Sequence, residues 1–216
     1  MAGQSQAVVD AILGRIEAGS LIPGAAIDGD RLARDVGVSA TPLREALIAL
    51  EAQGLIHRQP RKGAVVFKPT LRQFLAIMEV QARLEGQAAG LAARRLSVER
   101  GRRLEAVRDA CDAHMATFGD GDPDRYYQRN LDFHGTVAEA AGNDVLFSMV
   151  KSNALKLMAY YRARYRFTGV TAASVADHRA IAGAILDRDS PGAEEKMQRH
   201  VQFDDVTAMD LLTIFE

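Results

Sequence analysis

The feature that most constrains the fold of this chain is residues 31–63, which read RLARDVGVSATPLREALIALEAQGLIHRQPRKG. A helix over roughly 29–36, with Asp28 as its cap, stops at Gly37, and Ser39 then caps a second, amphipathic helix. Two short β-like runs follow around a basic tip. This order is typical of a winged helix-turn-helix, which presents its second helix to the major groove of DNA.

The flanking residues complete a small domain. Residues 5–18 predict a helix with Val8, Ile12 and Ile16 on one face, and residues 22–24 predict a turn. Residues 55–59 and 64–67 can pair as a hairpin whose tip is residues 60–63. We therefore expect a DNA-binding domain over residues 1–68, closed by Pro69.

The composition favours a globular protein of the cytoplasm. The chain has 216 residues, 48% hydrophobic and 25% charged, which is ordinary for such proteins. The single Cys111 excludes an intramolecular disulfide and fits a reducing compartment. The amphipathic start is unlike a signal peptide, and no apolar run reaches the roughly 18 residues of a membrane span. We therefore expect no membrane association.

The charge distribution is more informative than the net charge of −1. Residues 54–68 contain basic residues and no acidic one, which suits salt-sensitive contact with phosphate. At the start of the second helix, the expected DNA-binding residues are Ser39, Thr41, Pro42 and Arg44. The Ser39 and Thr41 hydroxyls can bind phosphate, Pro42 is tolerated in the first turn, and Arg44 can reach a guanine edge or a phosphate. The candidate wing residues are Arg61, Lys62 and Gly63. The alternative is a generic helix hairpin with a solvated charged loop.

From residue 70 onward the pattern is helical throughout. Amphipathic helices are expected at roughly 70–95, 97–118, 122–141, 143–167, 171–187 and 190–213, separated by cap and turn residues. No strand-like alternation occurs. We therefore predict a mainly α protein, with an antiparallel all-α bundle over residues 70–216 following the winged helix-turn-helix.

Histidines in the second domain form a candidate metal site. Asn130 and His134 are spaced i, i+4 and share one face of a helix, while His178 and His200 lie on later helices. Inward side chains from several helices of a bundle are a common way to build a metal site, and imidazole suits zinc, nickel, copper or iron. Each residue alone could equally be a hydrogen-bonded core or surface histidine, since spacing does not prove convergence.

The first domain resembles the GntR family of bacterial regulators over residues 7–67. The resemblance rests on Ile22-Pro23-Gly24, Leu32-Ala33, Gly37-Val38-Ser39, the run from Thr41 to Leu47, Leu50-Glu51, Gly54-Leu55 and Arg61-Lys62-Gly63. The family usually has a base-reading arginine where this chain has Ala40, and some members have one near Asp30. Both differences remove a positively charged side chain that could contact DNA. DNA recognition should therefore depend more on Arg44, the hydroxyls and the wing.

The second domain resembles the FCD ligand-binding domain of the FadR branch, over about 70–213. The matching segments are Arg83-Leu84-Glu85, Asn130 to His134, Ala141-Gly142-Asn143, His178 to Ile181 with Ala184-Ile185, and His200. The resemblance implies that Asn130, His134, His178 and His200 hold a divalent metal, zinc or nickel, beside which a small carboxylate effector binds. Asn130 replaces an aspartate found in many members, so we expect weaker metal retention. Arg83 is the candidate effector contact, through its guanidinium fork, or else a surface ion-pair partner.

These observations predict a metabolite-responsive repressor that binds a palindromic DNA operator as a homodimer. One alternative is a constitutive DNA-binding dimer with a degenerate sensor site. Another is a histidine-based metalloenzyme, which is disfavoured because no motif places a carboxylate as general base.

Overall fold

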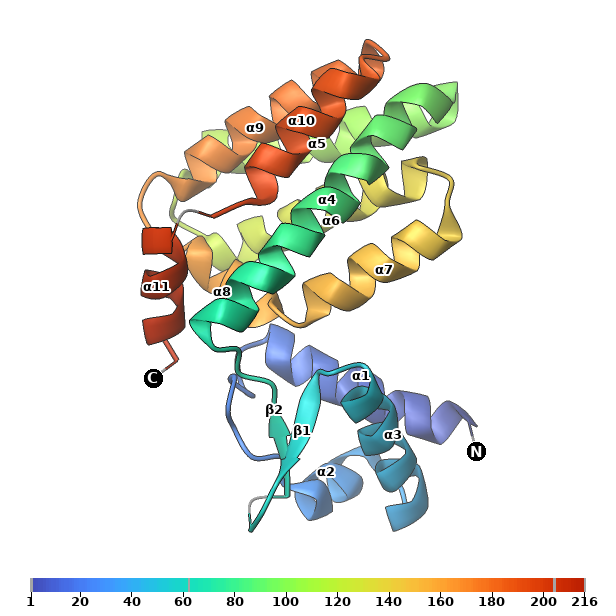
Figure 1. The fold of residues 1–216 in the computed structure, drawn as a ribbon, viewed down its shortest axis with the longest axis vertical. Helices are drawn as coiled ribbons and strands as arrows, with labels where there is room; N and C mark the ends of the chain where they lie inside the picture. Colours follow the sequence, from blue (N-terminus) through green and yellow to red (C-terminus); the bar gives the residue numbers. More distant parts are fainter. Residues whose placement is uncertain (1, 62, 204, 216) are drawn as a thin grey trace.

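The computed structural model describes residues 2–61, 63–203 and 205–215 (Figure 1). The first part consists of three helices followed by a two-stranded wing. Its elements are α1 (Ala2–Glu17), α2 (Gly29–Val36), α3 (Ala40–Ala52), β1 (Ile56–Gln59) and β2 (Gly63–Val66). The strands are antiparallel, with register from Ile56↔Val66 to Gln59↔Gly63. The predicted winged helix-turn-helix is therefore confirmed.

The turn between α2 and α3 follows from its sequence, with one correction. The Asp28 carboxylate accepts a hydrogen bond from the Arg31 amide at 2.9 Å, as expected of a cap, and Gly37 ends α2 in the left-handed region at φ 74°. Ser39 does occupy the N-cap position of α3, but its hydroxyl makes no capping hydrogen bond. Its extended backbone alone starts the helix, which leaves the hydroxyl exposed.

The left-handed turn at Gly37 gives a testable prediction. A Cβ added there would meet no atom within 4 Å, so a Gly37→Ala change acts through backbone strain alone. We expect a loss of about 1 kcal/mol in the free energy of unfolding, measured by urea denaturation. Gly14→Ala, inside α1 and equally unobstructed, is the control and should stabilise the protein by up to about 1 kcal/mol. Equal effects of the two changes would contradict the role of Gly37.

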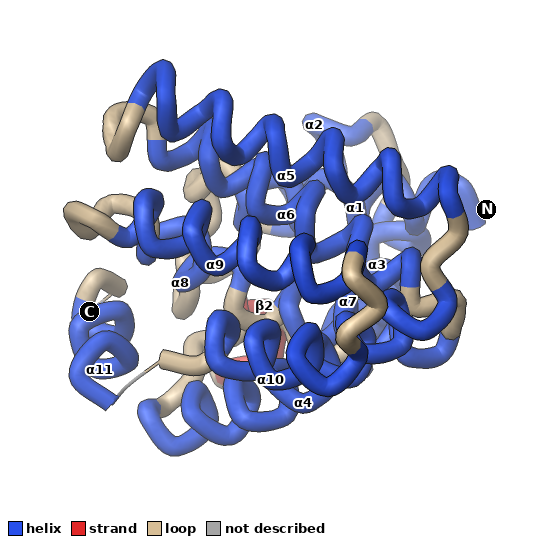
Figure 2. The backbone as a smooth tube through the Cα atoms, turned by 90° about the horizontal axis from the view of Figure 1, so that it is seen from above, coloured by secondary structure: helices blue, strands red, loops and turns tan. Residues whose placement is uncertain are grey.

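The remainder of the described chain is helical and forms an antiparallel bundle above the first domain (Figures 1 and 2). Its elements are α4 (Leu71–Arg95), α5 (Val98–Phe118), α6 (Pro123–Ala140), α7 (Asp144–Leu155), α8 (Met158–Arg164), α9 (Val170–Leu186), α10 (Ser190–Val201) and α11 (Asp205–Thr213). The helix α4 runs the length of the bundle and packs most closely on α10. This confirms the predicted mainly α fold. None of these helices is long and apolar enough to cross a bilayer, within the residues described.

Two of the predicted helices were wrong, because each is divided in two. The expected helix 143–167 breaks at Lys156-Leu157, where the buried Leu157 leaves helical geometry, and α8 then runs in a new direction. The expected helix 190–213 breaks after Val201, where Gln202 is extended and Phe203 stacks on Phe74. Neither break carries glycine or proline, so tertiary packing sets both.

The two domains have separate cores that meet at α8. One core contains Ile12, Leu32 and Leu50, and the other is built around aromatic residues such as Phe74. Met158, at the start of α8, packs into the core of the first domain. Hydrogen bonds also join the domains, from Gln128 Nε2 to Glu17 Oε1 at 2.8 Å and from Lys68 Nζ to the Phe215 carbonyl at 2.8 Å. The first domain is therefore held directly against the bundle.

His114 is a buried histidine outside the candidate metal set. Its ring lies 5.2 Å from that of Phe118 and 5.3 Å from that of Tyr126, measured between centroids. Neither ring nitrogen has a hydrogen-bond partner among the described residues. Burial lowers the pKa of His114, Asp122 opposes this shift, and Arg125 and Arg129 add to it.

The lowered pKa of His114 makes folding stability depend on pH. The folded state holds the ring neutral, so below the ordinary histidine pKa of about 6.5 the unfolded state binds more protons and stability falls. We expect His114→Phe to remove this part of the loss between pH 7.5 and 5.5. Urea denaturation at the two pH values measures it, and a variant whose loss equals that of the wild type would contradict the assignment.

Candidate metal centre and DNA-binding face

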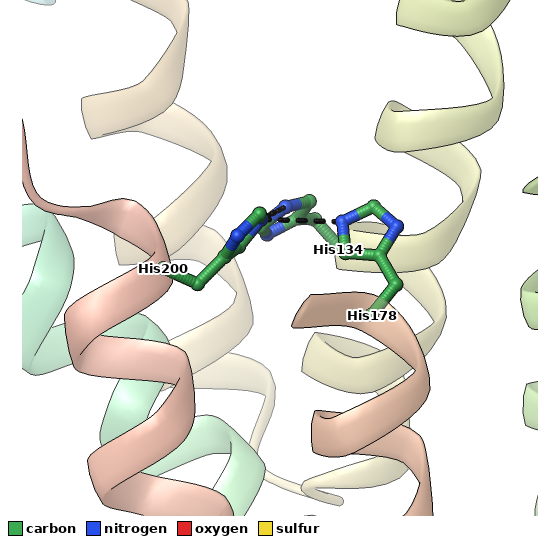
Figure 3. Close-up of side chains that lie close together, drawn as sticks. All are labelled: His134, His178 and His200. Atoms are coloured by element: carbon green, nitrogen blue, oxygen red, sulfur yellow. Dashed lines mark hydrogen bonds between the residues drawn. The ribbon is translucent and has the colours of Figure 1, made fainter. Parts of the chain in front are cut away.

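Three histidines from three helices converge inside the bundle (Figure 3). His134 comes from α6, His178 from α9 and His200 from α10. The Nε2 atom of His200 lies 3.2 Å from that of His178 and 3.3 Å from that of His134. Phe133 stacks on the His178 ring at 3.9 Å between centroids and so fixes its plane. The structure thus brings together three of the four residues that the sequence suggested as metal ligands.

Carboxylates hold the outer nitrogens of two of these rings. The Nδ1 atom of His200 lies 2.9 Å from Asp177 Oδ2, and Nδ1 of His134 makes a short contact with Glu85 Oε2. If each Nδ1 donates its proton to its carboxylate, each Nε2 presents a lone pair to the centre of the cluster. Carboxylates in this position orient metal-binding histidines. The described residues offer no partner for Nδ1 of His178.

Burial favours the uncharged forms of His178 and His200, while Asp177 and Glu85 stay ionised. Burial lowers the pKa of His200 to about 4, although the hydrogen bond with Asp177 opposes the shift, and burial lowers that of His178 well below its usual value. The hydrogen bond from His200 lowers the pKa of Asp177. Burial acts to raise the pKa of Glu85, but the charge and hydrogen bond of His134, with other partners, outweigh it. Neutral imidazoles are the form that binds metals.

Asn130 lies one helical turn before His134 and is buried. Its Oδ1 atom accepts a hydrogen bond from the Tyr165 hydroxyl at 2.8 Å. An amide oxygen has two lone pairs, so this bond leaves one for a metal. The role of Asn130 as a ligand remains a prediction.

A cavity of about 300 Å³ opens on the outer side of the Glu85–His134 pair. The proposed effector contact, Arg83, does not line it. Arg83 is exposed on α4 and donates a hydrogen bond to Gln198 Oε1 at 2.8 Å. The cation at the cavity is instead Lys151 of α7. One turn of helix separates Glu85 from Gln81, and both face the cavity, whereas Arg83 points to the α10 side.

The N-terminal end of α3 forms the candidate DNA-binding face. Ser39, Thr41 and Arg44 are exposed, and none of their side chains makes a hydrogen bond or ion pair within the described part of the chain. Pro42 was expected to contact DNA, but its side chain is buried with Ala46 on the face that packs into the domain. Pro42 therefore shapes the start of the helix, and its burial does not favour the predicted contact with DNA.

The wing presents further positive charge. Arg61 is exposed at its tip with φ 66°, Gly63 starts β2 at φ 71°, and Lys62 lies outside the described residues. Arg58 is paired with Glu51 at 3.2 Å, so it is less available to DNA.

Sequence reasoning missed the residues that support the site. Glu85 belongs to the Arg83-Leu84-Glu85 segment, but no function was predicted for it. The small residues that follow it in α4 were the only sign in the sequence that it is buried. Asp177 directly precedes His178 in the sequence, yet its carboxylate contacts His200 on another helix. Nothing in the sequence indicated that Lys151 lines a cavity. It was expected to lie within one long helix over 143–167.

Comparison with known families agrees with both halves of the chain. Residues 76–203 match the FCD domain, and residues 4–66 match the bacterial regulatory proteins of the gntR family. The FCD match alone covers more than half of the chain.

Individual relatives match this chain in sequence or in fold. The HTH-type transcriptional repressor GlaR of Escherichia coli is 28% identical over 171 residues, covering 74% of this chain and 75% of GlaR. A probable D-xylose utilization operon transcriptional repressor of Paenarthrobacter nicotinovorans is 27% identical over 194 residues, covering 90% and 84%. The structure of E. coli McbR/YncC shares the fold with a TM-score of 0.82 at 19% identity, covering 100% of both chains. The chain therefore belongs to the GntR family of DNA-binding transcriptional regulators, in the branch with an FCD domain, and is not an enzyme.

Proposed function

We propose that this regulator binds a divalent metal, zinc or nickel, through His134, His178 and His200, and that a small organic acid in the helical domain controls its binding to DNA. The observation that carries the proposal is the convergence of three Nε2 atoms, two of them from rings whose Nδ1 atoms face carboxylates. Asn130 is the proposed fourth ligand.

The spacing of the nitrogens fits a metal ion. Nitrogens about 2.0–2.1 Å from a tetrahedral zinc lie roughly 3.3 Å from one another. The two measured separations are 3.2 and 3.3 Å. A bound metal would supply a positive charge that attracts a carboxylate. The chain's own contribution is to hold three rings with their Nε2 atoms close together.

Regulation follows if the effector prefers one arrangement of the domains. Two copies of the chain would place two α3 helices on the half-sites of a palindromic operator, as two-fold symmetry requires. Repression is proposed because two of the relatives are named as repressors. A regulator of this kind acts in the cytoplasm, where its DNA is.

Metal analysis of protein purified without chelator tests the proposal. We expect about one zinc or nickel ion per chain, and a thermal-unfolding midpoint that falls when a chelator is added, because the metal stabilises the state that binds it. A constitutive dimer without a sensor would instead contain no metal and would not respond to chelator. In that case the three rings would share protons in Nε2–H···Nε2 hydrogen bonds.

A further inference from the structure

The cavity beside His134 lies between the two domains. Glu17, the last residue of α1, forms part of its wall, and so does Met158, whose side chain packs into the core of the DNA-binding domain. Glu85 and His134 lie on the bundle side. Figure 1 shows α1 running beneath α4 and α7. A ligand in this cavity would therefore contact both domains at once.

The polar groups on the bundle side are already satisfied. Gln81 Nε2 donates to Glu85 Oε1 at 2.7 Å and to the Val150 carbonyl at 3.3 Å, while Gln81 Oε1 accepts from Asn153 at 3.0 Å. Glu85 is further occupied by His134. Since a ligand would have to break these bonds to use the groups, they do not favour a ligand rich in hydroxyl or carboxyl groups.

The rest of the wall is mostly apolar. Apolar side chains come from α6, α7 and α8, and include Leu131, Phe147, Val150, Leu155 and Met158. Two of its polar groups already have partners, because Glu17 accepts a hydrogen bond from Gln128 and the Tyr161 hydroxyl donates to the Met78 sulfur. The Tyr127 hydroxyl and the Lys151 ammonium have no partner within the residues described. Lys151 is exposed at the rim and is the sole cation of the wall. At about 300 Å³ the cavity matches the lower end of small-molecule sites.

We propose that this cavity binds a monoanion with an aliphatic or aromatic body, whose anionic group pairs with Lys151 at the rim while the body fills the space between α1, α6 and α7. The ligand lies against the back of the Glu85–His134 pair, and His178 and His200 do not line the cavity. It therefore need not ligate the metal. The inference rests on the proposed function only in assigning effector binding to the helical domain.

A homologous series of straight-chain monocarboxylates tests the ligand class. Calorimetric titration of the full chain with butanoate, hexanoate and octanoate should show affinity rising about fourfold for each methylene buried. Succinate, a compact dianion, should bind far more weakly than octanoate. Affinity that is independent of chain length, or a preference for succinate, would overturn the proposal.

The glycines of the bundle provide matched variants that locate the site. Gly135, on α6, lines the cavity, and a Cβ placed there meets no atom within 4 Å, so Gly135→Leu would fill the space. Gly183, on α9, is equally unobstructed but lies outside the cavity. We expect Gly135→Leu to reduce octanoate affinity at least tenfold, and Gly183→Leu to leave it unchanged. Equal binding by both variants would overturn the location.

The role of Lys151 is tested with an uncharged analogue. Wild-type protein should bind octanoate about two- to fivefold more tightly than 1-octanol, as expected of an exposed ion pair. Lys151→Met should remove this preference, whereas Lys196→Met, on α10 outside the cavity, should keep it. An unchanged preference in Lys151→Met would overturn the role of Lys151.

Metal content measured on the same samples separates the two proposals. Octanoate binding that depends on Gly135, in protein without metal, would refute the metal site and leave the cavity proposal standing. Bound metal with no octanoate binding would refute the cavity proposal and leave the metal site standing.

Discussion

A His178→Ala variant is expected to lose the proposed divalent metal, with affinity lowered by about 100-fold or more. Residues that merely orient a ligand typically contribute 10–100-fold, so removing a ligand should cost at least the upper end of that range. His178 is fully buried and its Nε2 faces that of His200, so no solvent-exposed group can replace it. Metal analysis after dialysis, with a competing chelator to set the free metal concentration, measures the change.

His114→Ala is the matched control for this variant. It also removes a buried, aromatic-packed imidazole from the same domain, and both variants should lose stability because each leaves a cavity. His114→Ala should still bind metal and should still lose thermal stability when chelator is added. His178→Ala should not respond to chelator. If both variants retain the metal equally, the three-histidine site is refuted.

Replacing Arg44 by alanine should weaken specific DNA binding by about 5- to 150-fold, which corresponds to the 1–3 kcal/mol of a bidentate contact to a guanine. Arg44 is exposed one turn into α3 and has no partner within the described residues, so its guanidinium is available to a base edge. The operator is obtained by selecting bound fragments from a random duplex pool with wild-type protein. Gel-shift titration on the selected fragment measures affinity.

Salt dependence separates base reading from phosphate contact. Loss of a phosphate contact lowers the slope of log affinity against log salt by about 0.9, as expected for Arg61→Ala in the wing. Arg44→Ala should instead relax the base preference at one position of the site. Arg102→Ala, an exposed arginine on α5, is the control and should bind as the wild type does. Unchanged specific binding by Arg44→Ala would refute the assignment of α3 as the recognition helix.

Much of the fold could be predicted from local patterns, because caps and turns depend on neighbouring residues. Asp28 and Gly37 bound α2, and the hairpin follows from two short runs around a tip. The breaks after Leu155 and Val201 could not be predicted in the same way. Each occurs where a side chain packs against another part of the molecule: Leu157, which is buried, or Phe203, which is partly buried and stacks on Phe74.

The sequence by itself determined the class of protein and the three histidines, because residue type and resemblance identify chemistry that a fold will carry. Only the tertiary structure decided which groups meet. It places Glu85 and Asp177 beside the histidines, Lys151 and not Arg83 at the cavity, and the Pro42 side chain inside the first domain. The physical reason is that helical spacing fixes which side chains share a face, whereas the partner of that face depends on packing between helices distant in sequence.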